Sequence, residues 1–173
     1  MLLDKSFEYG KIENMQNARG QLHLFLTNPV LLSCIFSWLL AQFIKTLIKL
    51  FSGKVHSIKE LFELLFWQTG SMPSSHSALV ASLCTTIGFR SGINSDVFIL
   101  SLCFFFVTIR DAVGVRRASG IQAKVLNKLG KKLAEEGIID YKSIKEVQGH
   151  TPSEVAIGVL LGFFTGLAFS VLK

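Results

Sequence analysis

Two of the four histidines in this sequence lie beside polar residues that could bind a charged substrate or take part in its reaction. His150 precedes Glu154 by four residues, so a carboxylate on the next helical turn could accept a hydrogen bond from the imidazole. Such a partner fixes the tautomer and makes the other ring nitrogen a better nucleophile or base. An alternative stays open, because Thr151-Pro-Ser-Glu154 is also a good capping box, in which Glu154 would bond the backbone.

His76 lies in a segment that could bind an anion. The run Gly70-Ser-Met-Pro-Ser-Ser-His76 places a proline and three serines at the start of a predicted helix. The free N–H groups at a helix N-terminus bind phosphate, and Ser74 and Ser75 add hydroxyl donors. His76 adds a group that titrates near neutrality. The simpler alternative is that Ser74 only caps the helix.

Basic side chains complete this set of candidate ligands. Arg116 and Arg117 follow Asp111, which could hold one arginine in place. The planar guanidinium suits phosphate oxygens and keeps its charge, and we expect one arginine rather than both equally to make the contact. Gln42 and Lys45 share a helix face and could line an interior. Positive-inside topology is the alternative explanation for the arginine pair.

The composition excludes several classes of protein. Half of the 173 residues are hydrophobic and only 17% are charged, whereas a soluble domain carries about 25% charged residues. The net charge of +6 does not come from one basic run with interleaved aromatics, so we expect no nucleic-acid partner. Cys34, Cys84 and Cys103 lie in apolar stretches without CxxC spacing and indicate core residues. We predict no metal and no cofactor.

Four apolar runs predict an all-α integral membrane bundle of about four transmembrane helices with short interfacial helices. A transmembrane helix needs about 20 predominantly apolar residues. A capping box over 57–60, before the short apolar stretch 61–67, predicts an interfacial or re-entrant helix that ends near Gly70. The predicted spans cover residues 30–51, 74–90, 96–115 and 152–172.

The rest of the chain is organised around these spans. We expect residues 1–28 to form a polar segment without the apolar stretch of a cleaved signal peptide, and residues 29–173 to form a single membrane domain. Over 120–136, apolar residues recur at helical spacing opposite lysines, which predicts an amphipathic interfacial helix. In the last span, glycines recur every four residues, a pattern typical of close helix packing: Gly158, Gly162 and Gly166.

All the polar motifs fall on one side of the predicted membrane. They lie at the end of the first span, the start of the second, the end of the third and the start of the fourth, and alternating helices bring these four places together. Most of the 18 lysines and arginines lie on the same side. The positive-inside rule therefore predicts that this side faces the cytoplasm, at a bacterial inner membrane.

Three motifs, in order and with this spacing, resemble the type 2 phosphatidic acid phosphatase superfamily, which also contains the vanadium haloperoxidases. Pro73-Ser-Ser-His76 resembles its P-S-G-H motif, and His150 with Glu154 resembles its final H-x-x-x-D motif. With R-D-A-V-G-V-R-R starting at Arg110, the pattern looks like the small, divergent bacterial membrane branch of that superfamily. The resemblance covers the chain from about residue 30 to 170.

The resemblance implies a membrane phosphatase that hydrolyses a lipid phosphate or diphosphate, of the polyprenyl or phosphatidate type, through a phosphohistidine. It implies that His150 attacks phosphorus while Glu154 orients it. His76 would protonate the leaving oxygen and later activate water. Membrane lipid and the lipid phosphate are the implied partners. The implied phosphate-binding residues are Lys45, Ser74, Ser75, Arg116 and Arg117, with Asp111 in support.

The sequence also departs from the superfamily pattern. Ile144 stands six residues before His150, where the superfamily has its second arginine. An arginine from before the predicted 120–136 helix therefore has to return to the site in space. Lys45 is followed seven residues later by Ser52 rather than by Arg-Pro, and Glu154 replaces aspartate. The alternatives are a non-catalytic lipid-phosphate binder or transporter that uses the same pocket, and a structural membrane subunit.

Overall fold

The computed structural model describes residues 17–52, 72–146 and 149–171, and in these ranges all regular structure is helical. The interfacial or re-entrant helix predicted from residue 57 to near Gly70 lies outside the described residues. A helical stretch over 17–26 precedes the first long helix. The further elements are α2 (Pro29–Phe51), α4 (Ser75–Ser91), α5 (Asp96–Arg110), the π-helical turn η1 (Asp111–Val115), α6 (Arg116–Glu135) and α7 (Pro152–Val171).

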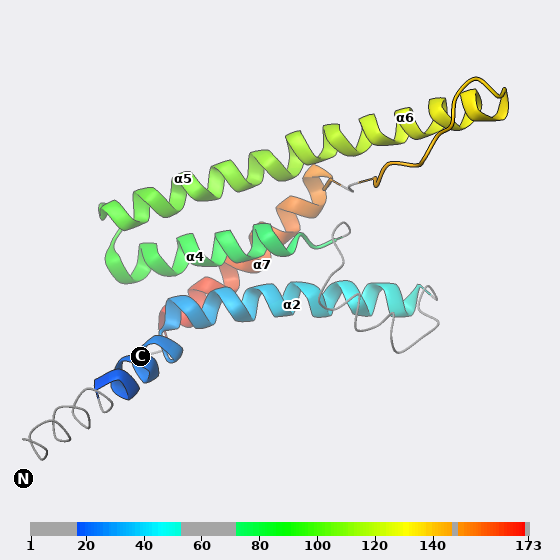
Figure 1. Cartoon of the computed structure of the whole chain (residues 1–173). Coiled ribbons are helices and arrows are strands. Elements are labelled where there is room, and N and C mark those ends of the chain that lie inside the picture. The colour runs from blue at the N-terminus through cyan, green and yellow to red at the C-terminus, as the bar shows by residue number, and fades with distance from the viewer. Residues whose placement is uncertain (1–16, 53–71, 147–148, 172–173) are drawn as a thin grey trace, which may run out of the picture.

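The predicted all-α membrane bundle is confirmed. Among the described residues, three helices are long and apolar enough to cross a membrane: α2, the continuous rod from α5 to α6, and α7. The remaining helix of the bundle, α4, has 17 residues and lies between α2 and α5 (Figure 1), where it also packs against α7. Because α4 has neighbours on three sides, it forms the core of the bundle.

Small residues allow α4 to take this central position. Its buried face is made mostly of serine, alanine and threonine, so neighbouring backbones approach closely. On the facing helix α7, a Cβ added at Gly158 would collide with the carbonyl oxygen of Ser74, and one at Gly162 with that of Ala78. A Cβ at Gly166 would lie 2.8 Å from the carbonyl oxygen of Ser82. The glycine pattern in the sequence thus corresponds to the observed contact of α7 with α4.

A polar contact inside the bundle joins three helices. The Thr86 hydroxyl is fully buried and lies 2.8 Å from the carbonyl oxygen of Ser82 on its own helix. It also lies 2.9 Å from the Ser33 hydroxyl of α2 and 3.2 Å from the Gly166 carbonyl oxygen of α7. Since no water competes for these groups inside a bilayer, the contact helps to fix how α2, α4 and α7 pack.

The structure joins the predicted span over 96–115 and the predicted interfacial helix over 120–136 into one rod of 40 residues, Asp96–Glu135. No proline interrupts this stretch, and η1 absorbs an extra residue without breaking the helix. At about 1.5 Å per residue, the rod is about 60 Å long, roughly twice the apolar thickness of a bilayer. Its α6 half therefore extends beyond the end of the bundle (Figure 1).

The contact between α7 and α4 predicts a large effect of a single methyl group. We expect Gly162→Ala to lower the free energy of unfolding by about 2 kcal/mol or more, because the new Cβ meets the backbone of Ala78 and the Cβ of Ala81. Thermal unfolding of the purified protein in detergent measures this. Gly20→Ala is the matched control, since nothing lies within 4 Å of its added Cβ. Equal midpoints for the two variants would contradict the assigned packing.

Candidate active site

The start of α4 and the start of α7 lie against each other. The backbone N–H of Ser74 donates to the carbonyl oxygen of Glu154 at 3.1 Å. One turn further along α7, Gly158 leaves no room for a side chain above Ser74. Two motifs that are about 75 residues apart in the sequence therefore meet at one end of the bundle, as their positions in the predicted spans require.

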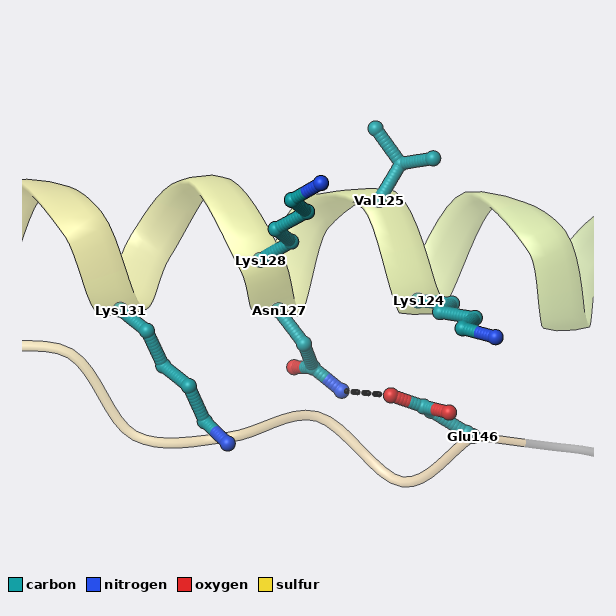
Figure 2. Close-up of a pocket in the computed structure, with 6 residues that line it drawn as sticks. All are labelled: Lys124, Val125, Asn127, Lys128, Lys131 and Glu146. Carbon is teal, nitrogen blue, oxygen red and sulfur yellow. Dashed lines mark hydrogen bonds between the residues drawn. The ribbon is translucent and has the colours of Figure 1, made fainter.

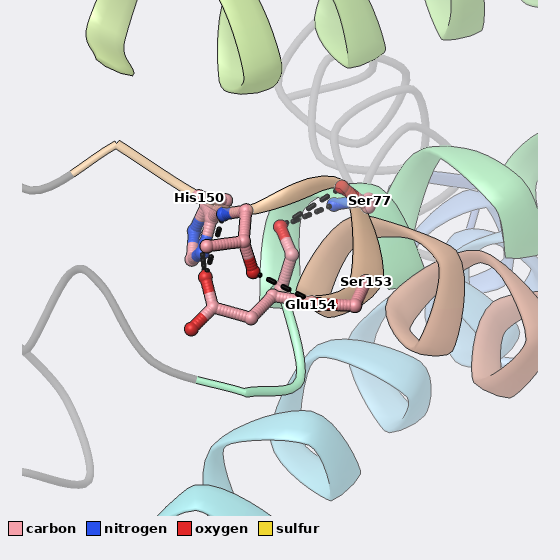
Figure 3. A network of polar contacts seen from close by, with 6 residues as sticks. Ser77, His150, Ser153 and Glu154 are labelled. Carbon is pink, nitrogen blue, oxygen red and sulfur yellow. Dashed lines mark hydrogen bonds and ion pairs between the residues drawn. The ribbon is translucent and has the colours of Figure 1, made fainter.

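His150 and Glu154 form the pair that their spacing predicts. The Nδ1 atom of His150 lies 3.3 Å from Oε2 of Glu154 (Figure 3). The same carboxylate oxygen accepts a hydrogen bond from the backbone N–H of Thr151 at 2.9 Å. The two interpretations that the sequence leaves open are therefore both realised, because one oxygen caps the helix and also contacts the imidazole.

His150 is buried, with 7% of its surface exposed, and its backbone is fixed as well as its ring. Its N–H donates to the carbonyl oxygen of Ala112 in η1 at 3.3 Å. Burial lowers the pKa of His150 and the charge of Lys45 lowers it further, while the hydrogen bond to Glu154 acts in the opposite direction. The net pKa lies below the usual 6.5, so the imidazole is neutral at pH 7.

His76 lies in the first turn of α4, next to residues with different roles. Ser74 is the N-cap: its hydroxyl oxygen accepts from the Ser77 hydroxyl at 2.8 Å and lies 3.4 Å from the Ser77 backbone nitrogen. Ser74 therefore caps α4, which is the simpler of the two roles that the sequence suggests for it. Ser75 is 3% exposed, whereas the imidazole of His76 is exposed. The free N–H groups of the first turn lie beside that imidazole.

Arg116 is held in place by Asp111, as the sequence suggests for one of the two arginines. Its Nε lies 2.6 Å from Oδ2 of Asp111. Residues five apart in a regular α-helix point about 140° away from each other, but the wider π-turn between these two brings them onto one side. The charge of Arg116 acts on both His76 and His150.

Arg117 plays a different part. Its backbone lies directly against Gly149, where an added Cβ would collide with the Arg117 Cα and nitrogen. Its side chain is exposed, and no ion pair joins it to any acid in the described part of the chain. Of the two arginines, Arg116 is thus the one that is electrostatically coupled to the histidines. Gly149 was not singled out from the sequence, although a glycine directly before a functional histidine indicates a close backbone approach.

Lys45 points to the same end of the bundle from α2. Both Lys45 and Gln42 are 3% exposed, so their shared face lies in the interior. The charge of Lys45 interacts with Glu154 and with both histidines. Within the described ranges, no carboxylate lies within 4 Å of its ammonium group. A buried cation without a direct counterion is costly in a membrane protein and suits a site that receives an anion.

The charges of the site favour an anion over a cation. Lys45 and Arg116 face two histidines, and the nearby carboxylates, Asp111 and Glu154, are each already bonded to one of these groups. In the ranges that the structure covers, no group of three or more His, Cys, Asp or Glu residues could hold a metal ion. The arrangement offers a neutral imidazole, a second imidazole and two cations whose charges act on both rings, which suits a phosphate group.

Comparisons with known proteins identify the family to which the chain belongs. The divergent PAP2 family matches residues 26–165 of the chain. Over 164 residues, the chain is 37% identical to the uncharacterized membrane protein YuiD of Bacillus subtilis (strain 168), an alignment that covers 84% of this chain and 96% of that protein. No solved structure matches the chain.

The two arginines should differ in their contribution to anion binding. We expect Arg116→Ala to weaken the binding of vanadate, a phosphate mimic, by about 10- to 100-fold, the range for a lost charged hydrogen bond. Arg117→Ala should have a smaller effect, because its side chain is not coupled to the histidines. Calorimetric titration of the purified protein measures both. Unchanged affinity in both variants would mean that neither arginine reaches the anion.

Proposed function

Because this chain belongs to the divergent PAP2 family, we propose that it is a membrane phosphatase that hydrolyses a lipid phosphate or diphosphate through a phosphohistidine. The observation that carries the proposal is the contact of the buried His150 with the half-buried Glu154, beside the start of α4. A bonded Nδ1 leaves Nε2 as the free nitrogen, and a pKa below 6.5 leaves it unprotonated. Both properties are needed in a nitrogen nucleophile.

In the first half of the reaction, Nε2 of His150 attacks phosphorus. The P–N bond forms as the bond from phosphorus to the ester oxygen breaks, and His76 gives its proton to that leaving oxygen. Glu154 stabilises the positive charge that develops on the ring of His150, since its carboxylate lies 3.3 Å from Nδ1. The products are a free lipid alcohol, or a lipid monophosphate from a diphosphate, and the phosphohistidine.

In the second half, water takes the place of the lipid. His76, now neutral, removes a proton from the water as its oxygen attacks phosphorus. The P–N bond breaks and its electrons return to His150, which leaves inorganic phosphate and the starting enzyme. The exposure of His76 suits this role, because it has to meet both the leaving group and the incoming water.

The cations hold the phosphate oxygens during both steps. Lys45 approaches from α2 and Arg116 from the start of α6, while Ser75 and the N–H groups of the first turn of α4 approach from a third side. These donors are oriented before the substrate arrives, because Asp111 holds Arg116 and the bundle interior surrounds Lys45. Preorganised donors stabilise the charge of the transition state without a cost of reorientation.

The position of the site suits a substrate from the membrane. It lies at the end of helices that are long and apolar enough to span a bilayer, so a phosphate headgroup can enter while its chains stay in lipid. A lipid phosphate of the polyprenyl or phosphatidate type satisfies this arrangement. We assign the site to the cytoplasmic face of a bacterial inner membrane, because most lysines and arginines lie at the same end.

Substitution of the two histidines tests the proposed activity. We expect His150→Ala to remove nearly all release of phosphate from lipid phosphates by the purified protein, since it removes the nucleophile. His76→Ala should lower the rate by about 100- to 10,000-fold, the range for a general acid and base. His23→Ala is the matched control, because His23 lies in the helical stretch over 17–26, away from the site. Comparable activity in all three variants would contradict the mechanism.

The pH dependence tests the role of Glu154. His150 has to be neutral to attack, so activity should fall as the pH drops through its pKa, and burial puts this acid limb below 6.5. Glu154 raises the pKa of His150, so Glu154→Gln should move the acid limb to still lower pH and lower kcat. The glutamine can still accept from Thr151 and keep the helix cap. An unmoved acid limb in this variant would mean that Glu154 serves the cap alone.

A further inference from the structure

The segment that returns from α6 to the site has one main anchor. After α6 ends, residues 137–146 run back along the helix toward the bundle (Figure 1). Gly137 makes the reversal with a φ of 70°, and the N–H of Ile138 donates to the carbonyl oxygen of Leu133 at 2.9 Å. We call residues 137–146 the return segment. It has no helix or strand of its own, so its place depends on what holds it to α6.

Asn127 of α6 provides that attachment through four hydrogen bonds. Its Nδ2 donates to the Ile144 carbonyl oxygen at 2.9 Å and to Oε1 of Glu146, also at 2.9 Å (Figure 2). Its Oδ1 accepts from the Ile144 N–H at 2.8 Å and from the Tyr141 hydroxyl at 2.6 Å. The amide group is buried, and it pairs with Ile144 as a neighbouring β-strand would.

Packing holds the return segment most closely at Tyr141. Its ring lies on Gly130, where any Cβ would collide with it. Residues 142–146 are exposed, and near Glu146 an open cavity of about 430 Å³ lies along α6, lined by Lys124, Val125, Asn127, Lys128, Lys131 and Glu146. Because this part of the segment has little burial, the hydrogen bonds of Asn127 hold Ile144 and Glu146 against the helix.

The attachment matters because the nucleophile proposed above follows directly. Only three residues separate Glu146 from His150, so they can span at most about 14 Å. Gly149 lies against the backbone of Arg117, and the N–H of His150 bonds Ala112. The chain that leaves the bundle after Arg117 therefore returns to the same place at Gly149. The position of the return segment determines whether Gly149 and His150 reach that place.

We propose that Asn127 is a positioning residue for His150, an inference that rests on the proposed phosphatase activity. It makes no contact with the phosphate. It holds the return segment so that the imidazole stays against Glu154 and next to the anchored Arg116. Loss of the Asn127 side chain should therefore lower the rate at which His150 attacks phosphorus. Lys45 and Arg116 should continue to hold the phosphate oxygens, because α2 positions Lys45 and Asp111 positions Arg116.

A graded set of variants tests this on the full-length protein in detergent. Asn127→Ala removes all four hydrogen bonds and should lower kcat by about 10- to 100-fold, the effect expected of a small misplacement of a reacting group. KM should stay within about twofold, since binding interactions are retained. Tyr141→Phe removes one bond and should lower kcat less. Lys131→Ala is the matched control, because it lines the same cavity without an ion pair to the segment.

A second measurement reports on the position of His150 without turnover. Diethylpyrocarbonate modifies accessible histidines, and mass spectrometry of the peptides follows each site. His150, buried in the wild type, should react several-fold faster in Asn127→Ala, while His23 should react at an unchanged rate. If the wild-type protein showed no turnover, the proposed phosphatase activity would be refuted. The rate at which diethylpyrocarbonate modifies His150 would still test whether Asn127 holds the return segment in place. Unchanged kcat or unchanged reactivity of His150 in Asn127→Ala would overturn the proposal.

Discussion

The close contact of α7 with α4 is the constraint on which the other features of the site depend. Gly158, Gly162 and Gly166 let the backbone of α7 lie on the carbonyl oxygens of α4, at a distance that no side chain would allow. This contact sets the starts of the two helices side by side, and a hydrogen bond from Ser74 to Glu154 fixes their register. The two histidine motifs meet because the helices behind them are locked together over their length.

The interior of the bundle is unusually polar for a protein with this many apolar residues. Serines and threonines line the faces of α2 and α4, and the Thr86 hydroxyl contacts both neighbouring helices. These small side chains allow close backbone approach, and among them the Thr86 hydroxyl is fully bonded, whereas the buried hydroxyls of Ser37 and Ser82 have no hydrogen-bond partner within the described residues. The same packed interior surrounds Lys45, whose buried charge interacts with Glu154 but has no carboxylate within 4 Å among the described residues.

The chain between Arg117 and Gly149 bears on how the proposed site fits the family pattern. Ile144 stands six residues before His150, where the superfamily has an arginine. In the structure, η1 brings Arg116 and Asp111 onto one side of the helix, and beyond the return segment the N–H of His150 bonds Ala112. Under the proposed function, Arg116 takes the role of the missing arginine. The insertion lies outside the bundle, so its length places no demand on the packing of α2, α4 and α7.

The sequence by itself determined the helical membrane class and the family, and it offered the pairing of His150 with Glu154 as one of two interpretations. These features follow from local patterns: apolar runs of sufficient length, short motifs in order, and a spacing of four residues on a helix. The glycine repeat likewise indicated close packing, because its period matches that of one helix face.

Only the tertiary structure decided that residues 96–135 form one rod, that Arg116 and not Arg117 is coupled to the histidines, and that one oxygen of Glu154 serves both the cap and the imidazole. A π-turn has no clear signal in sequence, because it depends on the contacts around it rather than on a local preference. The anchor at Asn127 joins residues 17 and 19 positions apart, and a single buried amide gives no periodic pattern. Such features arise from packing between segments, which local sequence does not encode.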